Sequence, residues 1–254
     1  WARTVLCESP NCGAEIPLMR SFWLCKKPNR LRALEYHVER RTGKPPHVEF
    51  AVFAPRSETG AAGGTVTRAK ATCLACSAVL APDRVRAQLT AQHGGADVVF
   101  DATGTRTGGA RMLAAITLTP REQGRHYRVP TERDYEAVRK AQARLAGVLE
   151  QWTRGGRIGP CPVPDEHIST NELRRISVPL YGMTTWGDLF TARQKFALAW
   201  LASAIRRIDS PQLQELCALA LSGVVDRNSA LATWRPQGDQ EKVEHVFARQ
   251  ALGM

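Results

Sequence analysis

Two cysteine pairs, Cys7 with Cys12 and Cys73 with Cys76, constrain this chain more than any other feature. Zinc-binding knuckles supply two thiolates each, and two intervening residues, as between Cys73 and Cys76, are their standard spacing. The wider spacing of the first pair is followed by Gly13, which suits the tight turn of a knuckle. We therefore expect Cys7, Cys12, Cys73 and Cys76 to hold one structural Zn²⁺, because four thiolates leave no position for substrate or water.

The alternative for these residues is four unrelated buried thiols. The chain has seven cysteines, and an odd number without a secretion signal argues against a disulfide framework. A reducing cytoplasmic setting fits better. Cys25, Cys161 and Cys217 lack a partner at knuckle spacing, and we expect them to be packing residues.

The first part of the chain, residues 1–120, reads as β-rich. Alternating or short apolar segments at 47–54, 64–73 and 111–120 predict strands, and glycine-rich segments separate them. The period then changes to that of a helix over 132–152, with Thr131 as N-cap. Residues 153–167 are rich in Pro and Gly and read as a linker. These changes predict a zinc-ribbon domain at 1–120, a helix and linker at 121–165, and a helical region at 166–254.

The helical region contains two capping signals. Thr191 with Gln194 forms a capping box, and Ser210 with Pro211 is an N-cap followed by Pro at the first helical position. A last helix is expected over 240–252. The fold class is therefore α+β, a β-rich zinc-ribbon part followed by a mainly helical part. The apolar stripes expected on the first two of these helices are Ala197, Trp200, Leu201, Ala204, Ile205 and Ile208, then Leu213, Leu216, Cys217, Ala220, Leu221 and Val224.

The chain is strongly basic, with a net charge of +11, which fits a nucleic-acid partner or simply an arginine-rich composition. A basic run just after the first cysteine pair is interleaved with Phe22 and Trp23 and resembles a nucleic-acid surface. A solvated charge run beside core aromatics is the alternative. The candidate nucleic-acid-binding residues are Arg20, Lys26, Lys27, Arg30 and Arg32, with a weaker set at Arg174, Arg175 and Arg193.

Catalytic signatures are missing from the sequence. It contains no dinucleotide-binding glycine fingerprint, no phosphate loop and no nucleophile elbow. The histidines are scattered singly, without metal spacing. No apolar stretch is long enough for a transmembrane helix, and we expect no membrane partner. We assign no catalytic residue.

Four stretches together resemble the central part of the large prokaryotic adenine-specific DNA methylases that contain a zinc ribbon. They span nearly the whole chain in the family's order, although residues 28–64 match weakly. They are WARTVLCESPNCGAEIPLMRSFWLCKK, ATCLACSAVL, YGMTTWGDLFTARQ and DRNSALATW…FARQALGM. The match to the cysteine knuckles and to the segment 181–194 is the most specific.

The resemblance implies a parent enzyme that transfers a methyl group from S-adenosylmethionine to adenine in DNA. The family's cofactor motif precedes the matching region and its Asp-Pro-Pro-Tyr motif follows it; the nearest string here, KPPH at 44–47, lacks both the acid and the aromatic. The chain would then lie between the catalytic halves, with DNA and the remainder of the methyltransferase as partners and no catalysis of its own. Tyr181, Trp186 and Phe190 of the signature segment suit base stacking or packing, and packing is favoured.

Two functions remain open, and a third, a complete enzyme with an unfamiliar site, is weaker because the catalytic motifs are missing. The chain is either a DNA-contacting insertion of such a methylase, or a zinc-stabilised structural or protein-interaction module. The position of the basic run distinguishes them: a common face with the knuckles favours DNA contact. Scatter, or pairing with Glu35, Glu39 and Glu58, favours the structural module.

Overall fold

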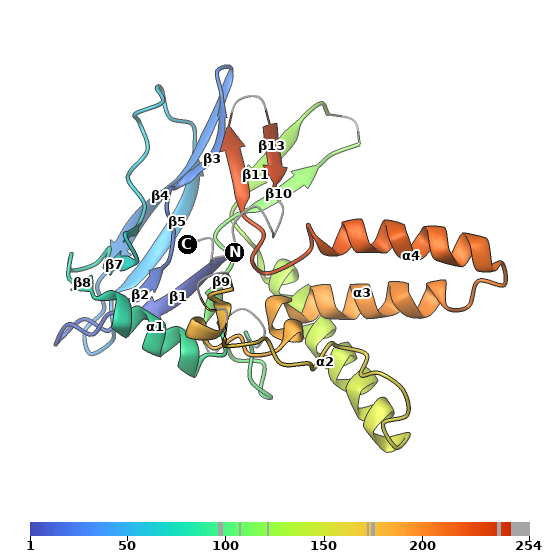
Figure 1. Ribbon diagram of the computed structural model, residues 1–254. Helices are drawn as coiled ribbons and strands as arrows, with labels where there is room; N and C mark the ends of the chain where they lie inside the picture. The colour runs from blue at the N-terminus through green and yellow to red at the C-terminus, as the bar shows by residue number, and fades with distance from the viewer. Residues whose placement is uncertain are drawn as a thin grey trace.

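The computed structural model describes residues 1–95, 99–106, 108–120, 122–171, 173, 176–237 and 240–244. Within this part of the chain the protein has an α+β fold, as the sequence predicted (Figure 1). Short antiparallel sheets form one side of the molecule, and helices project from the other.

The strands occur mostly in the first half of the chain, with one further hairpin near residue 240. They are β1 (Ala2–Leu6), β2 (Glu15–Pro17), β3 (Trp23–Lys27), β4 (Arg30–Glu39), β5 (His47–Phe53), β6 (Val66–Thr67), β7 (Lys70–Thr72), β8 (Val79–Leu80), β9 (Ala110–Arg111), β10 (Ala115–Leu118), β11 (Arg125–Arg128), β12 (Trp234–Gln237) and β13 (Gln240–Val243). The helices are α1 (Pro82–Ala91), α2 (Glu132–Arg154), α3 (Ala192–Ile205) and α4 (Pro211–Val225), with 3₁₀ turns η1 (Val178–Tyr181) and η2 (Trp186–Leu189).

Three three-stranded sheets are built from strands within residues 1–111. Their orders are β2-β1-β9, β3-β4-β5 and β6-β7-β8, and each strand pair is antiparallel. The longest pairing joins β4 to β5, from Glu39 opposite His47 to Ala33 opposite Phe53. Each sheet is too small to bury much surface alone, so stability depends on packing between them.

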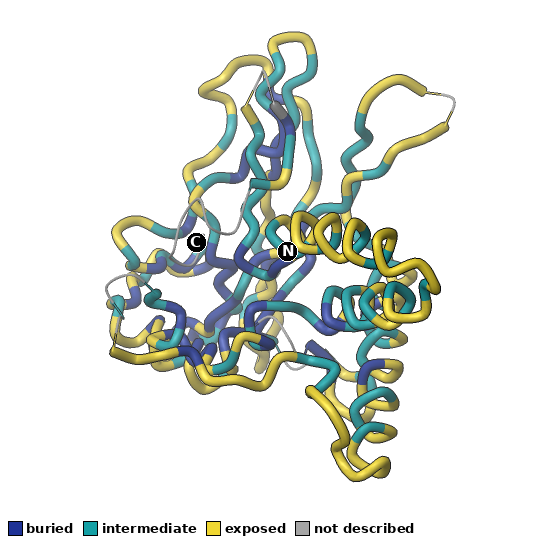
Figure 2. The backbone as a smooth tube through the Cα atoms, turned by 45° about the vertical axis from the view of Figure 1, so that its right-hand side comes forward, coloured by how far each residue is buried: buried dark blue, intermediate teal, exposed yellow. Residues whose placement is uncertain are grey.

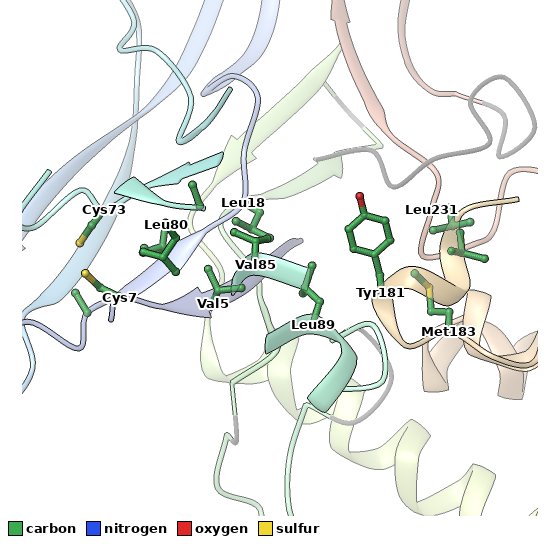
Figure 3. Packing of buried hydrophobic residues seen from close by; sticks show 14 of the residues in the cluster. Val5, Cys7, Leu18, Cys73, Leu80, Val85, Leu89, Tyr181, Met183 and Leu231 are labelled. Carbon is green, nitrogen blue, oxygen red and sulfur yellow. The ribbon is translucent and has the colours of Figure 1, made fainter. Parts of the chain in front are cut away.

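The largest hydrophobic core joins distant parts of the sequence (Figure 3). It includes Cys7 and Cys73, continues through Leu80 and Leu89, and reaches the part of the chain that begins at Ile168. The members from that segment are Ile168, Val178, Tyr181, Met183, Leu189 and Leu231. The division at residues 120 and 165 stays a prediction, but the first and third of those regions share this core.

The helix caps follow the local sequence signals. Thr131 and Asp134 form a capping box at the start of α2, and Thr191 with Gln194 does the same for α3. The Ser210 hydroxyl accepts a hydrogen bond from the amide of Leu213 at the start of α4. These predictions are confirmed. Each cap forms between residues three positions apart, so the local sequence is enough to predict it.

Other expectations need correction. The segment expected as a strand at 64–73 is the hairpin β6–β7, which turns at Arg68 and Ala69 with φ values of 49° and 62°. The helix α1 was not anticipated, and β12–β13 lies within the region expected to be helical. The prediction of a helix over 240–252 is wrong for its first four residues, because Gln240–Val243 is strand β13. Residues 245–254 lie outside the described part of the chain.

Candidate metal centre

Both cysteine pairs lie in turns between antiparallel strands. The first turn joins β1 to β2, whose last facing residues are Leu6 and Glu15, and the second joins β7 to β8 in the same way. In each turn the amide of the first cysteine donates to a carbonyl across the turn, Cys7 to Ala14 and Cys73 to Ala78. The two pairs are therefore built as equivalent knuckles.

A left-handed residue follows the second cysteine of each knuckle. Gly13 has φ of 64° and Ser77 has φ of 62°, although only glycine adopts this conformation at no steric cost. The backbone therefore turns the same way after Cys12 and after Cys76. In the second knuckle the amide of Ala75 also points to the Cys73 sulfur at 3.4 Å.

The four sulfur atoms meet in one cluster. The Sγ atoms of Cys7 and Cys76 are 3.6 Å apart, those of Cys12 and Cys73 are 3.8 Å apart, and all four lie within 4.8 Å of one another. These separations exceed the ~2.05 Å of a disulfide. They match the edge of roughly 3.8 Å expected for a tetrahedron of thiolates about 2.3 Å from a central ion. The cluster could therefore hold a metal ion.

The surroundings give the thiols different acidities. Burial raises the pKa of the Cys7 thiol to about 12, and burial also raises the pKa of Cys73. A backbone hydrogen bond from Ala78 lowers the pKa of Cys76, the most exposed of the four, to about 7. Thiolates are the metal-binding form, so a metal entering this cluster displaces protons.

A basic loop and a hydrophobic layer support the cluster. Arg40, directly after β4, donates to the carbonyl of Ala75 inside the second knuckle at 2.7 Å. Val5, Ile16 and Leu80 belong to the same core cluster as Cys7 and Cys73. Leu80 and Val5 lie beside these cysteines in Figure 3. The role of Arg40 was not anticipated, because its binding to Ala75 links residues 35 positions apart.

The remaining cysteines lie outside the four-cysteine group. Cys25 is fully buried, and Cys161 and Cys217 are partly buried. Among the described residues, Cys7, Cys12, Cys73 and Cys76 form the only group of at least three His, Cys, Asp or Glu side chains placed to share an ion.

Two of the predicted nucleic-acid-binding residues are engaged within the protein. Glu241 of β13 has a fully buried side chain, and Lys27 Nζ and Arg30 Nη2 lie 2.7 and 2.8 Å from its carboxylate. Arg125 approaches the same oxygen at 3.5 Å, and the Tyr127 hydroxyl donates to the other. Burial raises the pKa of Glu241, but the hydrogen bond and charge of Lys27, together with the Arg30 charge, outweigh it, and the pKa lies below its ordinary value.

Lys27 and Arg30 are also distant from the knuckles. Lys27 and Arg30 flank the turn between β3 and β4, and the knuckles lie near the opposite end of β4, where Glu39 leads to Arg40. A strand of this length spans about 30 Å. The acid that pairs with Lys27 and Arg30 is Glu241, not Glu35, Glu39 or Glu58.

The other predicted basic residues have separate surroundings. Lys26 lies over the Trp23 ring at 5.2 Å, and Arg32 donates to the carbonyl of Leu31. Arg20 is exposed and borders, with Lys26, a cleft of about 920 Å³. The aromatic residues of the run cannot stack on bases, because Phe22 and Trp23 are buried. Arg174 and Arg175 lie outside the described residues, and Arg193 is exposed near the start of α3.

The segment 181–194 is mainly a packing element. Tyr181 and Met183 are buried in the main core, and Phe190 packs against it. Asp188 accepts hydrogen bonds from the amides of Thr184 and Thr185, which fixes the turn at η2. The side chain of Asn228 donates to the carbonyl of Val224 and so caps the end of α4.

Comparisons with protein-family models, with curated proteins and with solved structures found no match to this chain. Within the described residues, no helix combines the length and the apolar composition that crossing a membrane requires.

Proposed function

We propose that this chain is a zinc-ribbon module whose four-cysteine cluster binds one structural Zn²⁺. The observation that carries the proposal is the convergence of four thiols from two equivalent knuckles. Soft thiolate ligands in tetrahedral order select Zn²⁺ or an iron–sulfur centre over hard cations. Four protein ligands complete the zinc coordination, so the ion acts on folding and not on a substrate.

Zinc in this position would join segments that are otherwise weakly connected. The knuckle strands β7 and β8 have only three and two residues, and β2 has three. Strand pairs of this length are not stable alone. An ion shared by both knuckles would link Cys7 to Cys76 across 69 positions and hold the sheets in place.

The resemblance to zinc-ribbon adenine-specific DNA methylases supports a place for the module inside a larger enzyme. In that setting S-adenosylmethionine and the catalytic residues belong to the parent enzyme, and this chain organises the catalytic halves. The buried pairing of Lys27 and Arg30 with Glu241 favours this structural role over a DNA-contacting role for the whole basic run.

A second candidate function is DNA contact at the cleft bordered by Arg20 and Lys26. Trp1, half exposed, and the partly buried Trp234 also line this cleft, so cations and aromatic rings occur together there. That combination is typical of nucleic-acid surfaces. Unlike Lys27 and Arg30, Arg20 and Lys26 form no ion pair with another residue among those that the structure describes.

Metal analysis tests the first function. The purified chain should contain one zinc ion per molecule, and cobalt exchanged into it should show thiolate-to-metal charge-transfer absorption. Cys12→Ser should lower the metal content and weaken these bands, whereas Cys161→Ser should change neither. A chain that folds normally without any metal, or a cobalt spectrum without thiolate bands, would contradict the proposal.

Salt-dependent DNA binding tests the second function. Fluorescence anisotropy of a labelled duplex should give an affinity that falls steeply with salt. The double variant Arg20→Ala with Lys26→Ala should reduce the slope of log affinity against log salt by about 1–2, whereas Lys140→Ala with Arg144→Ala, exposed on α2 and outside the cleft, should leave it nearly unchanged. Equal slopes for all three proteins, or no binding at low salt, would leave only the structural function.

A further inference from the structure

An arginine without an acidic partner lines the cleft that Arg20 and Lys26 border. Arg3 lies on β1, which is mostly buried (Figure 2), and its own side chain is partly buried. Its Nε donates to the carbonyl of Gly94 at 2.6 Å, and its Nη2 donates to the carbonyl of Ala230 at 3.1 Å. Among the described residues no carboxylate forms an ion pair with Arg3, and its Nη1 has no hydrogen-bond partner. The guanidinium is therefore held in position while its charge is not neutralised.

The surroundings of Arg3 make this charge costly. Burial lowers the pKa of the Arg3 guanidinium to about 10, so the group is still protonated at neutral pH. A cation that is withdrawn from water without a counter-charge raises the free energy of the folded protein. A bound anion would supply the missing counter-charge. Phosphate suits this role because its oxygens accept the directed hydrogen bonds of a guanidinium.

The rest of the cleft is also positively charged. Its described lining contains four cations, Arg3, Arg20, Lys26 and Arg235, against one carboxylate, Glu244. That carboxylate lies 3.0 Å from the guanidinium of Arg235. The volume of about 920 Å³ is large enough for a nucleotide-sized ligand.

Arg20 starts from a backbone position close to Arg3. The amide of Leu18 donates to the carbonyl of Arg3 at 2.7 Å. Two residues of chain span at most about 7 Å, so the backbone of Arg20 lies within that distance of Leu18. Arg3 and Arg20 therefore come from adjoining segments and can contact the same anionic group.

An aromatic ring is fixed on another part of the cleft lining. The indole N–H of Trp234 donates to the carbonyl of Leu24 on β3 at 2.8 Å, and Arg125 lies over its ring at 5.9 Å. Leu24 and Lys26 line the cleft from the same strand. A ring held in this way loses little conformational freedom when a ligand stacks on it.

We propose that this cleft binds one nucleotide of a single-stranded nucleic acid, with a phosphate on Arg3 and Arg20 and a base against Trp234. The inference rests on the second candidate function, DNA contact at the same cleft, and names the form of nucleic acid that it takes. Cations that track phosphates beside an aromatic ring are the usual features of single-strand sites. The bases of a duplex are paired and stacked, so they cannot reach a ring that lines a cleft.

Fluorescence anisotropy with a labelled single strand, and with a duplex of the same sequence, tests the form of nucleic acid. The single strand should bind at least about fivefold more tightly, because base stacking adds to the phosphate contacts. Thymidine monophosphate as a competitor separates a strand from a free nucleotide. A duplex that binds as tightly as the single strand, or displacement of the strand by an equal concentration of the mononucleotide, would overturn the proposal.

Substitution of Arg3 tests the position of the phosphate. Arg3→Gln should weaken single-strand binding at least about 10-fold and reduce the slope of log affinity against log salt by about 1. The matched control is Arg106→Gln. Arg106 is also partly buried and donates to a backbone carbonyl, that of Ala110, but it pairs with Glu15 and lies outside the cleft. The control should leave affinity and slope unchanged.

The outcomes separate this inference from the function on which it rests. DNA binding that depends on Arg20 and Lys26 but not on Arg3 would reject the inference and keep DNA contact at the cleft. No binding of either form at low salt would reject both. Circular dichroism establishes that each variant is folded.

Cross-linking decides the question without a variant if Arg3→Gln fails to fold. Irradiation of the wild-type chain with a single strand that carries 5-iodouracil should give an adduct at Trp234, located by mass spectrometry. Adducts found only outside the cleft would overturn the proposal.

Discussion

At the scale of single residues, Cys73 and Cys25 are both buried thiols with different surroundings. Cys73 belongs to the four-cysteine cluster and Cys25 does not. We expect Cys73→Ala to lose the proposed zinc and to lower the free energy of unfolding by roughly 3–5 kcal/mol. Cys25→Ala removes a small buried group and its hydrogen bond to Glu241, and should cost only about 1–2 kcal/mol. Urea denaturation with zinc analysis measures both, and equal losses for the two variants would contradict a metal at the cluster.

Glu241 is one of the residues that join β12–β13 to the neighbouring strands β3, β4 and β11. Its buried carboxylate is neutralised by Lys27, Arg30 and Arg125. Glu241→Gln leaves those cations without their anion. Since the cations are partly exposed, we expect a loss of about 1–3 kcal/mol at neutral pH in place of the larger cost of a wholly buried pair.

The pKa of Glu241 gives this prediction a pH dependence. Its folded pKa lies below the ordinary value of 4.5, so the carboxylate stabilises the fold fully above that pH. The stabilisation is lost as the pH falls through the folded pKa. The difference between wild type and Glu241→Gln should therefore be greatest near neutral pH and shrink below about pH 4. If the difference in unfolding free energy between wild type and Glu241→Gln does not change with pH, Glu241 does not stabilise the fold through its charge.

At the scale of elements, the segment 181–194 docks onto α1 through a glycine contact. Gly182 has φ of 88°, and a β-carbon there would lie 2.8 Å from the Thr90 backbone. Gly182→Ala should therefore separate η1 from α1 and cost about 2–4 kcal/mol. Gly147→Ala in α2 is the control, because its β-carbon meets no atom within 4 Å and should add about 0.5–1 kcal/mol of stability. Thermal melting of both variants tests the contrast, and similar melting temperatures would refute it.

The same scale shows which elements a sequence can predict. The caps at Thr131, Thr191 and Ser210 depend on neighbouring residues, and these helix starts are confirmed. The strand β13 pairs with its neighbour β12. It is also held by cations around Glu241, such as Lys27, that come from distant positions in the sequence. α1 lacks a side-chain cap and is only ten residues long, so its local signal is weak.

Periodicity predicts that a helix has an apolar stripe but not what covers that stripe. For α2 the apolar positions Val138 and Leu145 are buried. For α4 the stripe with Leu213 and Leu216 is exposed in the described part of the chain. The difference arises because burial depends on tertiary or quaternary partners, which the period of a single helix does not specify.

At the scale of the whole molecule, the cysteine cluster was predictable because ligand spacing is a local property repeated twice. The meeting of the two knuckles within 4.8 Å is the long-range consequence of that pattern. The engagement of Lys27 and Arg30 was not predictable, since their partner Glu241 lies more than 200 residues away. Sequence alone therefore located the candidate metal site better than any surface for a partner.

Removal of the proposed zinc should affect the molecule along its shared core. Cys7 and Cys73 pack into the cluster that continues through Leu89 to Tyr181 and Met183 (Figure 3). We therefore expect a strong chelator to lower the protection of backbone amides from hydrogen exchange in the knuckles first. Protection at the contact of α1 with η1 should fall next. α2, α3 and α4 do not touch the cysteines through that cluster and should remain helical.

Hydrogen exchange followed by mass spectrometry, on the zinc-loaded and metal-free chain, measures this order directly. Amides of β1, β2, β7 and β8 should exchange much faster without metal, because metal binding to such knuckles is coupled to their folding. Amides of α2 should change little, since its buried residue Val138 packs in a separate cluster with Phe100 and Ala110. Uniform loss of protection would mean that the metal controls the entire fold, and unchanged protection after verified metal loss would mean that the hydrophobic core holds the knuckles unaided.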